Sequence, residues 1–242
     1  MKHHEFWSAP VFNARFYVYL FDKMILAGIG PRDILKADYG IPNGDLRASK
    51  YTIQQLVGEQ HFPTTLLIPR HLSRDDKKQQ ILAFARTHPF PLMGKPEISE
   101  CGKAIKFLRD AHDVDHLVSA ISASYLVQTY VDLPVEYGVF YVRHADTSRI
   151  VGINGKSFPT ITGDGQRTVQ ALIEAHDRYT FHWNNFVHGF DMQRVLNDGE
   201  RLRLSHIGSH TMGCVFTDET PLATPQIAKR LFSILECVGG AI

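Results

Sequence analysis

One lysine lies in an otherwise apolar stretch of the chain, Phe90-Pro-Leu-Met-Gly-Lys95-Pro96. The apolar run that ends at a proline predicts a short strand over Leu92–Pro96. A lysine that such a strand carries into a cleft would place a compact positive charge where a phosphate group could bind. The alternative is a lysine that faces water at the edge of a sheet, which is the usual place for this residue type.

The segment after this strand, residues 97–104, contains small and polar residues around Gly102. Backbone N–H groups of a loop that turns at a glycine can point at a phosphate oxygen. An ordinary surface loop would have the same composition. The single glycine therefore leaves both interpretations open.

A third pattern joins an apolar strand, Leu126-Val-Gln-Thr-Tyr-Val131, to Glu136 at the start of the next strand. Backbone groups at the end of such a strand could hydrogen-bond to the edge of a purine, and the carboxylate could accept hydrogen bonds from ribose hydroxyls. A plain sheet with a solvated glutamate is the alternative.

The elements that must position these residues alternate irregularly, with several strands in succession between helices. This order predicts an α+β fold in which a sheet is layered with helices. Ser49, Ser73 and Thr168 are the expected N-caps of three of the helices. The end of the chain, Gly239–Ile242, is interpreted as the entry to a strand. Helices are predicted over 11–29, 49–59, 73–86, 113–124, 168–184 and 225–238, and strands over 64–69, 92–96, 125–131, 136–144, 149–158, 201–207 and 212–217.

The composition is that of a globular protein: 242 residues, 44% hydrophobic, 21% charged and a formal net charge of +1. This excludes a wholly disordered chain, and it gives no overall field to attract nucleic acid or a membrane surface. Cys101, Cys214 and Cys237 are widely spaced and odd in number, which suits a reducing compartment. No uninterrupted apolar run is long enough to span a membrane. We expect a cytoplasmic protein with neither nucleic acid nor membrane as a partner.

The thirteen histidines raise the question of a metal site. His206 and His210 are four residues apart, but Gly208 between them argues against the shared helix face that binds zinc in metalloproteases. The other histidines considered, at positions 176, 182 and 188, have no matching cysteine or acid spacing. We predict no metal ligands in this chain.

Three segments in this order resemble the ATP-grasp superfamily: the strand around Lys95, the stretch Val127–Arg143, and Gly155–Ile173 with its Gly-Asp-Gly-x-x-Thr phrase. Within that superfamily the likeness is to carboxylate–amine ligases related to cyanophycin synthetase and D-alanine–D-alanine ligase. His206–Asp218 is similar to the segment that follows in those enzymes. Glu5-Phe-Trp7 and Ala48-Ser-Lys50 are similar to the opening of a related group.

The resemblance implies a set of roles by position. Lys95 and Lys50 match lysines of the nucleotide site, and Gly102 lies in the loop that covers the phosphates. Gln128, Tyr130 and Val131 would belong to the adenine hinge, and Glu136 would hold the ribose. The candidate catalytic residues are Lys156, at a basic position near the acceptor or phosphates, and His210.

The sequence departs from the relatives at several of these positions. Ser99 and Cys101 stand where the relatives tend to have glycine and arginine, and Thr129 replaces a common hinge acid. We therefore expect weaker phosphate affinity or looser closure of the loop.

The resemblance also implies an organisation into lobes around a nucleotide cleft. It places an N-terminal α/β lobe over residues 1–88 and an ATP-grasp region over 89–242, with a small lobe at about 89–130 and the start of a large lobe at 131–242. ATP-grasp enzymes carry their Mg²⁺ ligands on two late strands, and this chain stops where the first of them should begin. Asp218, Glu219 and Glu236 are the late acids, and none is a convincing substitute. The expected fold is thus incomplete at its C-terminal part, either as a fragment or as a natural short form.

The implied function is an ATP-dependent carboxylate–amine ligase, which forms an acyl phosphate and then an amide. Its partners would be ATP, with the Mg²⁺ usual for the family, and a small-molecule or peptide carboxylate. The alternative is an inactive nucleotide-binding module with a regulatory or docking role. The acceptor, the amine and the oligomeric state stay open.

Overall fold

The computed structural model describes residues 9–30, 49–99, 102–133, 135–144 and 147–241. The chain divides into two compact units, residues 1–48 with Ile242, and residues 49–241. In the first unit, helix α1 (Ala9–Ala27) exposes large apolar side chains such as Val18 and Leu26. Within the described ranges, no helix has both the length and the apolar character needed to cross a bilayer. The sequence of residues 38–45, with its Asn43-Gly44 pair, also predicts a turn, and this stretch and the segment Glu5–Trp7 lie outside the described residues.

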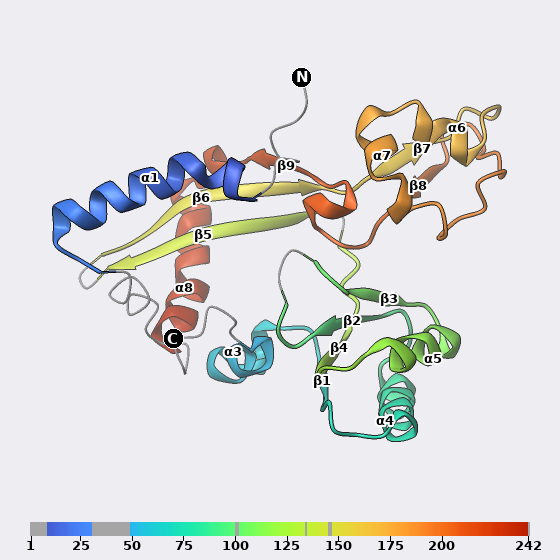
Figure 1. Ribbon diagram of the computed structural model, residues 1–242, viewed down its shortest axis with the longest axis horizontal. Helices are drawn as coiled ribbons and strands as arrows, with labels where there is room; N and C mark the ends of the chain where they lie inside the picture. Colours follow the sequence, from blue (N-terminus) through green and yellow to red (C-terminus); the bar gives the residue numbers. More distant parts are fainter. Residues whose placement is uncertain (1–8, 31–48, 100–101, 134, 145–146, 242) are drawn as a thin grey trace. The chain divides into compact units, whose positions relative to one another are not determined.

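A four-stranded antiparallel sheet organises the first half of the second unit (Figure 1). Two helices, α4 (Arg74–Thr87) and α5 (Ala111–Ala120), pack against this sheet. The shared core contains the fully buried residues Ile81, Leu92, Val114 and Val127. The strands, in the order β1-β4-β2-β3, are β1 (Thr65–Ile68), β4 (Tyr125–Thr129), β2 (Leu92–Pro96) and β3 (Lys106–Leu108). Strand β1 shares this sheet with β2–β4, although the predicted boundary at residue 88 lies between them in sequence.

Side-chain caps fix where the helices begin. The Ser49 hydroxyl accepts from the backbone N–H of Thr52 and starts α3 (Lys50–Val57), and Ser73 does the same for α4 through Asp76. Two acids in the first turn of α4 also interact favourably with the helix dipole. These caps are confirmed as predicted because they depend only on residues within one turn.

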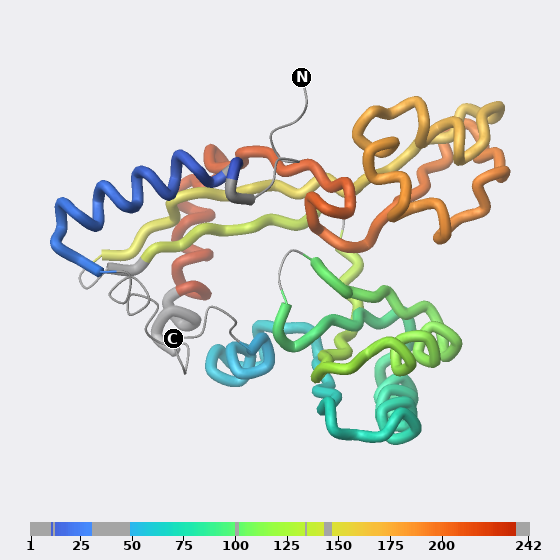
Figure 2. Tube along the Cα trace, viewed as in Figure 1, coloured from blue at the N-terminus to red at the C-terminus, as the bar shows by residue number. Residues whose placement is uncertain are grey.

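A long β-hairpin dominates the second half of this unit, and its two strands run side by side in Figure 2. They are β5 (Glu136–His144) and β6 (Thr147–Ser157), and β9 (Val215–Asp218) pairs with β6. The sequence predicts a hairpin turn at Ala145–Ser148 between these strands, and residues 145–146 of it lie outside the described part of the chain. Helix α8 (Pro225–Ala241) follows β9.

A smaller sheet pairs β7 (Thr160–Thr162) with β8 (Arg201–Arg203), and α6 (Val169–Glu174) and α7 (Asp177–Phe181) lie beside it (Figure 1). Phe186, Leu196 and Ile173 are fully buried in its core. Short 3₁₀ helices complete the unit: η2 (Glu59–His61), η3 (Trp183–Asn185), η4 (His210–Met212) and η5 (Thr220–Leu222).

Two predictions of secondary structure were wrong, and the short strands β3 and β7 were not predicted. The single helix expected over 168–184 is two helices, because His176 adopts an extended backbone that breaks the helix and Tyr179 then reaches the core containing Phe186. Residues 239–241 continue α8 and do not enter a strand, since a helix satisfies its backbone hydrogen bonds within itself. Strands β3 and β7 have only three residues each, which are too few to show an alternating pattern.

Candidate functional site

A cavity of about 320 Å³ lies in the second unit and gathers most of the residues predicted to bind a nucleotide. Lys95, Gln128, Tyr130, Val131 and Glu136 all line it. The remaining lining residues are Pro63, Met93, Ile105, Thr129, His206, Ile207 and Gly208.

The pairing of β2 with β4 explains how Lys95 and Gln128 come together. Met93 is directly opposite Gln128, and Lys95 is two residues further along β2. Because side chains alternate along a strand, Met93, Lys95 and Gln128 share one face of the sheet. The residues on either side of Lys95, Gly94 and Pro96, are buried. Gln128 is itself held by a 2.6 Å hydrogen bond from its Nε2 to the Thr65 hydroxyl.

Lys95 is electrostatically perturbed at this position. Burial lowers its pKa, and the positive charge of Lys50 lowers it further. Both causes disfavour the ammonium form while the cavity holds no anion. An anionic group in the cavity would therefore relieve an unfavourable charge, as is required of a phosphate site.

Lys50 is the first residue of α3, at the start of the helix where the resemblance places it. Its Nζ donates to the Ser99 carbonyl oxygen at 2.7 Å and to the Ser99 hydroxyl at 3.1 Å. The Ser49 hydroxyl also donates to the Glu97 carboxylate at 2.5 Å. Lys50 is not among the residues that line the cavity, and it anchors the start of the loop predicted to cover the phosphates.

Gly102 lies in the second part of that loop with a positive φ of 72°. A Cβ at this position would lie 3.1 Å from Ser209 Cβ and 3.2 Å from Ile207 Cγ2. The missing side chain thus lets the loop approach the segment that closes one side of the cavity. Tyr125 holds the same loop by donating its hydroxyl to the Ala104 carbonyl, and burial raises the pKa of Tyr125 to about 12.

Glu136 lies at the start of β5 and is ion-paired with Lys156, its cross-strand partner on β6. A Cβ at Gly208 would lie 2.9 Å from Glu136 Oε2, so this glycine makes room for the carboxylate. Lys156 also lies over the Phe216 ring at 5.7 Å, and His210 stacks on the same ring at 3.9 Å. Lys156 thus contacts Glu136 directly, and His210 is connected to this pair through Phe216, but neither predicted catalytic residue is among those that line the cavity.

An aromatic cluster of Phe107, Tyr130 and His206 forms another part of the site. The imidazole of His206 stacks on Phe107 at 4.1 Å, and its Nδ1 lies 2.9 Å from the Tyr130 hydroxyl. The Arg203 guanidinium donates to the Tyr130 oxygen at 3.5 Å, and the Tyr130 hydroxyl also interacts with the Asp132 carboxylate. Burial, followed by the charge of Arg203, lowers the pKa of His206, whereas Asp132 opposes this shift.

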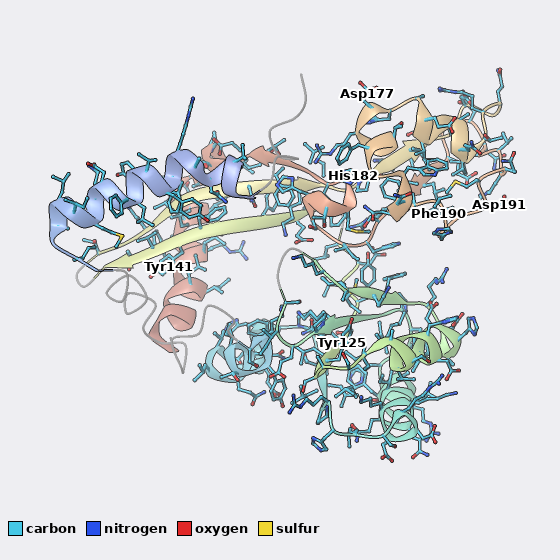
Figure 3. The ribbon with its side chains drawn as sticks, in the orientation of Figure 1. Tyr125, Tyr141, Asp177, His182, Phe190 and Asp191 are labelled. Atoms are coloured by element: carbon cyan, nitrogen blue, oxygen red, sulfur yellow. The ribbon has the colours of Figure 1, made fainter. Side chains whose placement is uncertain are left out.

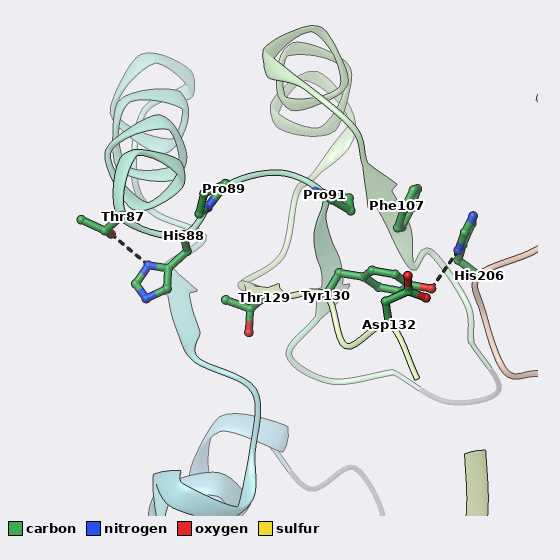
Figure 4. Close-up of a pocket in the computed structure, with 9 residues that line it drawn as sticks. All are labelled: Thr87, His88, Pro89, Pro91, Phe107, Thr129, Tyr130, Asp132 and His206. Atoms are coloured by element: carbon green, nitrogen blue, oxygen red, sulfur yellow. Dashed lines mark hydrogen bonds between the residues drawn. The ribbon is translucent and has the colours of Figure 1, made fainter. Parts of the chain in front are cut away.

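The cluster also borders a second cavity of about 460 Å³, whose lining is drawn in Figure 4. Thr129, Tyr130 and His206 line both cavities. The sequence did not indicate this role for Phe107 and Arg203, and it suggested His206 only as a discarded metal ligand and as part of a family-like segment. Contacts between side chains so far apart in the sequence leave no local pattern.

The residues that the structure describes include no group of three or more His, Cys, Asp or Glu side chains that could hold a metal ion. The Asp218 carboxylate accepts from the Thr220 backbone N–H at 2.9 Å, and Glu219 accepts from the Thr217 hydroxyl at 2.9 Å. Hydrogen bonding to Thr220 lowers the pKa of Asp218. Both late acids are thus engaged in local contacts.

No family model and no curated protein matches the chain. Among solved structures, it aligns with a bifunctional glutathione synthetase from Pasteurella multocida (12% identity, TM-score 0.35) over 78% of this chain and 28% of that one. It also aligns with a D-alanine–D-alanine ligase from Bacillus anthracis (10%, TM-score 0.44; 80% and 48%). A third is a carboxyaminoimidazole ribonucleotide synthase from Aspergillus clavatus, solved with ATP (11%, TM-score 0.39; 70% and 43%).

The chain spans less than half of the length of each of these three structures. Because their TM-scores are below 0.5, these alignments assign no role to any residue of this chain. Those roles are argued from the cavity itself.

Proposed function

We propose that the chain binds ATP in the 320 Å³ cavity and acts as an ATP-grasp carboxylate–amine ligase. One observation carries this proposal: Lys95, Gln128, Tyr130, Val131 and Glu136, predicted as nucleotide ligands from separate segments, line a single cavity. The walls combine one partly buried cation, one carboxylate and aromatic side chains. That combination suits the phosphates, the sugar and the base of a nucleotide.

Each group has a role that its chemistry supports. Lys95 would bind the phosphates as a point charge, and the lower dielectric around a partly buried group would strengthen the attraction to an anion. Strand β4 ends at Thr129, so the backbone of Tyr130 and Val131 continues beyond the paired part of the sheet and could read the adenine edge. Glu136 would accept hydrogen bonds from the ribose hydroxyls while Lys156 balances its charge.

The proposed reaction has two steps. The oxygen of a substrate carboxylate attacks the γ-phosphorus of ATP, which yields an acyl phosphate and ADP. An amine then attacks the acyl carbon, inorganic phosphate leaves, and an amide forms after loss of a proton. Such chemistry depends mainly on positioning and on charge stabilisation, in which Lys95 and Lys156 would take part.

ATP-grasp ligases usually use Mg²⁺ beside ATP to neutralise the phosphates. The described residues include no group of three or more His, Cys, Asp or Glu side chains that could hold a metal ion, so no step is assigned to Mg²⁺. The same observation favours the second candidate function, a module that binds a nucleotide without turning it over.

Trapping of the acyl phosphate separates the two candidates. The protein would be incubated with ATP, Mg²⁺, hydroxylamine and a panel of carboxylic acids, and both hydroxamate and phosphate would be measured. Hydroxamate that depends on ATP and disappears in Lys95→Ala supports the ligase. Saturable ATP binding without phosphate release supports the binding module, and the absence of both binding and turnover overturns the proposal.

A further inference from the structure

Two histidines on α5 lie one helical turn apart on its exposed surface. His112 and His116 are four residues apart, a spacing at which side chains on a helix are neighbours. Their Nε2 atoms are 3.0 Å apart, and the rings are nearly perpendicular at a centroid distance of 4.5 Å. The contact is a hydrogen bond in which one imidazole donates its Nε2–H to the Nε2 of the other, so the same nitrogen of each ring faces its neighbour.

This separation matches the spacing of two neighbouring ligands on one metal ion. Imidazole nitrogens bind divalent transition metals at roughly 2.0–2.1 Å, so two nitrogens at right angles around an ion lie ~3.0 Å apart. A tetrahedral angle would require ~3.4 Å at the same bond length. Small rotations of the two side chains from their 3.0 Å contact would reach either spacing, so both nitrogens can bind the same ion.

The helix that carries the pair is firmly positioned. Val114, Leu117 and Val118 on the opposite face are buried in the core of the four-stranded sheet. The Asp110 carboxylate caps the first turn by accepting from the backbone N–H groups of His112 and Asp113. Both histidine Cα positions are therefore fixed without any ligand, and only side-chain rotation must adjust when an ion binds.

The neighbouring carboxylates are already engaged. Asp113 accepts from the Arg109 guanidinium at 2.8 Å, and Asp115 pairs with Lys78 at 2.6 Å. The ligand set is thus limited to the two imidazoles, which agrees with the absence of any larger metal-binding group among the described residues. Water would complete the coordination.

We propose that His112 and His116 form a surface chelate for a divalent transition metal ion, which binds Cu²⁺ most tightly and Ni²⁺ next. Affinity for imidazole ligands increases toward Cu²⁺ along the first transition series, which sets this order. The bound ion would bridge one turn of α5 and so stabilise the folded chain. This site is separate from the proposed ATP site and does not depend on it.

The test is a titration of CuCl₂ and NiCl₂ into the full chain, followed by calorimetry and by the electron paramagnetic resonance spectrum of bound Cu²⁺. The adjacent His3 and His4 could also chelate metal, so all variants are made in a His3→Ala/His4→Ala background. His116→Asn keeps a polar partner for His112 but removes a good ligand. His71→Ala, at another exposed histidine, is the matched control.

The proposal predicts one Cu²⁺ bound per chain, with coupling to two nitrogens and tighter binding than Ni²⁺. His112→Ala and His116→Asn should each weaken Cu²⁺ binding by about tenfold or more, whereas His71→Ala should leave it unchanged. Unfolding curves without metal confirm that each variant is folded. Unchanged Cu²⁺ affinity in both His112→Ala and His116→Asn would show that the pair is only a hydrogen bond and would overturn the proposal.

Discussion

The two regions that supply the walls of the cavity are built differently. The four-stranded sheet packs against α4 and α5, with Ile81, Leu92 and Val127 fully buried. The β5–β6 hairpin leaves large apolar side chains in solvent, with Phe140 55% and Val151 47% exposed. Lys95 and Gln128 thus belong to a side of the cavity that core packing holds in place. The position of the Glu136 carboxylate depends instead on its ion pair with Lys156 and on the space left by Gly208.

Two tyrosines, both labelled in Figure 3, show the same contrast. Tyr125 on β4 is 3% exposed, and its hydroxyl is bonded to the Ala104 carbonyl. Tyr141 on β5 has a buried hydroxyl with no hydrogen-bond partner within the part of the chain that is described. The sheet satisfies its buried polar groups, and the hairpin does so less completely. We therefore expect the sheet side of the cavity, which would bind the phosphates, to be more rigid than the hairpin side, which would bind the ribose.

The largest expected effect is on stability and contrasts the two regions directly. Leu92→Ala removes a fully buried side chain between β2 and the helices and should cost ~2–5 kcal/mol of unfolding free energy. Phe140→Ala, at an exposed hairpin position, should change it by about 0.5 kcal/mol or less. Urea unfolding measures both. Similar losses in the two variants would contradict the contrast.

The next largest effect is expected at Lys95, on the sheet side of the cavity. Lys95→Ala should weaken ATP binding by about tenfold or more, because the partly buried cation that would meet the phosphates is lost. Lys106→Ala is the matched control, since Lys106 is an exposed lysine of the same sheet that does not line the cavity. Calorimetric titration checks both. Equal affinities in Lys95→Ala and in the unmodified chain would remove Lys95 from the site.

The pH dependence of binding should reveal the interaction between the two lysines. The pKa of Lys95 is lowered by burial and then by Lys50, so its charge is lost at a lower pH than that of an ordinary lysine. Tripolyphosphate affinity should therefore fall as the pH rises through the alkaline range. Lys50→Gln removes one cause and should move the fall to higher pH. The same fall in Lys95→Arg as in the unmodified chain would show that another group titrates.

The smallest effect is expected at Glu136, on the hairpin side of the cavity. Glu136→Ala should weaken ATP binding several-fold through ~0.5–1.5 kcal/mol of lost hydrogen bonding to the ribose. Its effect on tripolyphosphate should be smaller, because that ligand has no sugar. The change also leaves Lys156 without its carboxylate partner, so Glu136→Ala/Lys156→Ala is the control for the freed charge. Equal losses for both ligands in the double variant would count against the ribose role.

The sequence predicted well those features that short-range chemistry decides. Strands β2 and β5 have the predicted bounds, and Ser49, Ser73 and Thr168 cap their helices. A side chain and a backbone N–H three residues away determine such a cap. The break at His176 and strand β3 depend instead on packing and pairing with distant segments, which no local pattern shows.

The same distinction between local patterns and contacts of distant segments applies to the candidate site. The resemblance implied nucleotide roles for Lys95, Gln128 and Glu136, and all three line a single cavity. The stacking of His206 on Phe107 and the attachment of Lys50 to Ser99 are contacts between segments far apart in the chain. Only the three-dimensional structure shows that Lys50 holds the loop and that His206 forms part of the wall.

Isothermal titration of ATP into the full chain, with and without Mg²⁺, tests the central claim that this cavity binds a nucleotide. The account predicts saturable binding at one site, weakened in Lys95→Ala and retained in Lys106→Ala. Absence of saturable ATP binding under both conditions, or equal binding by Lys95→Ala and the unmodified chain, would contradict it.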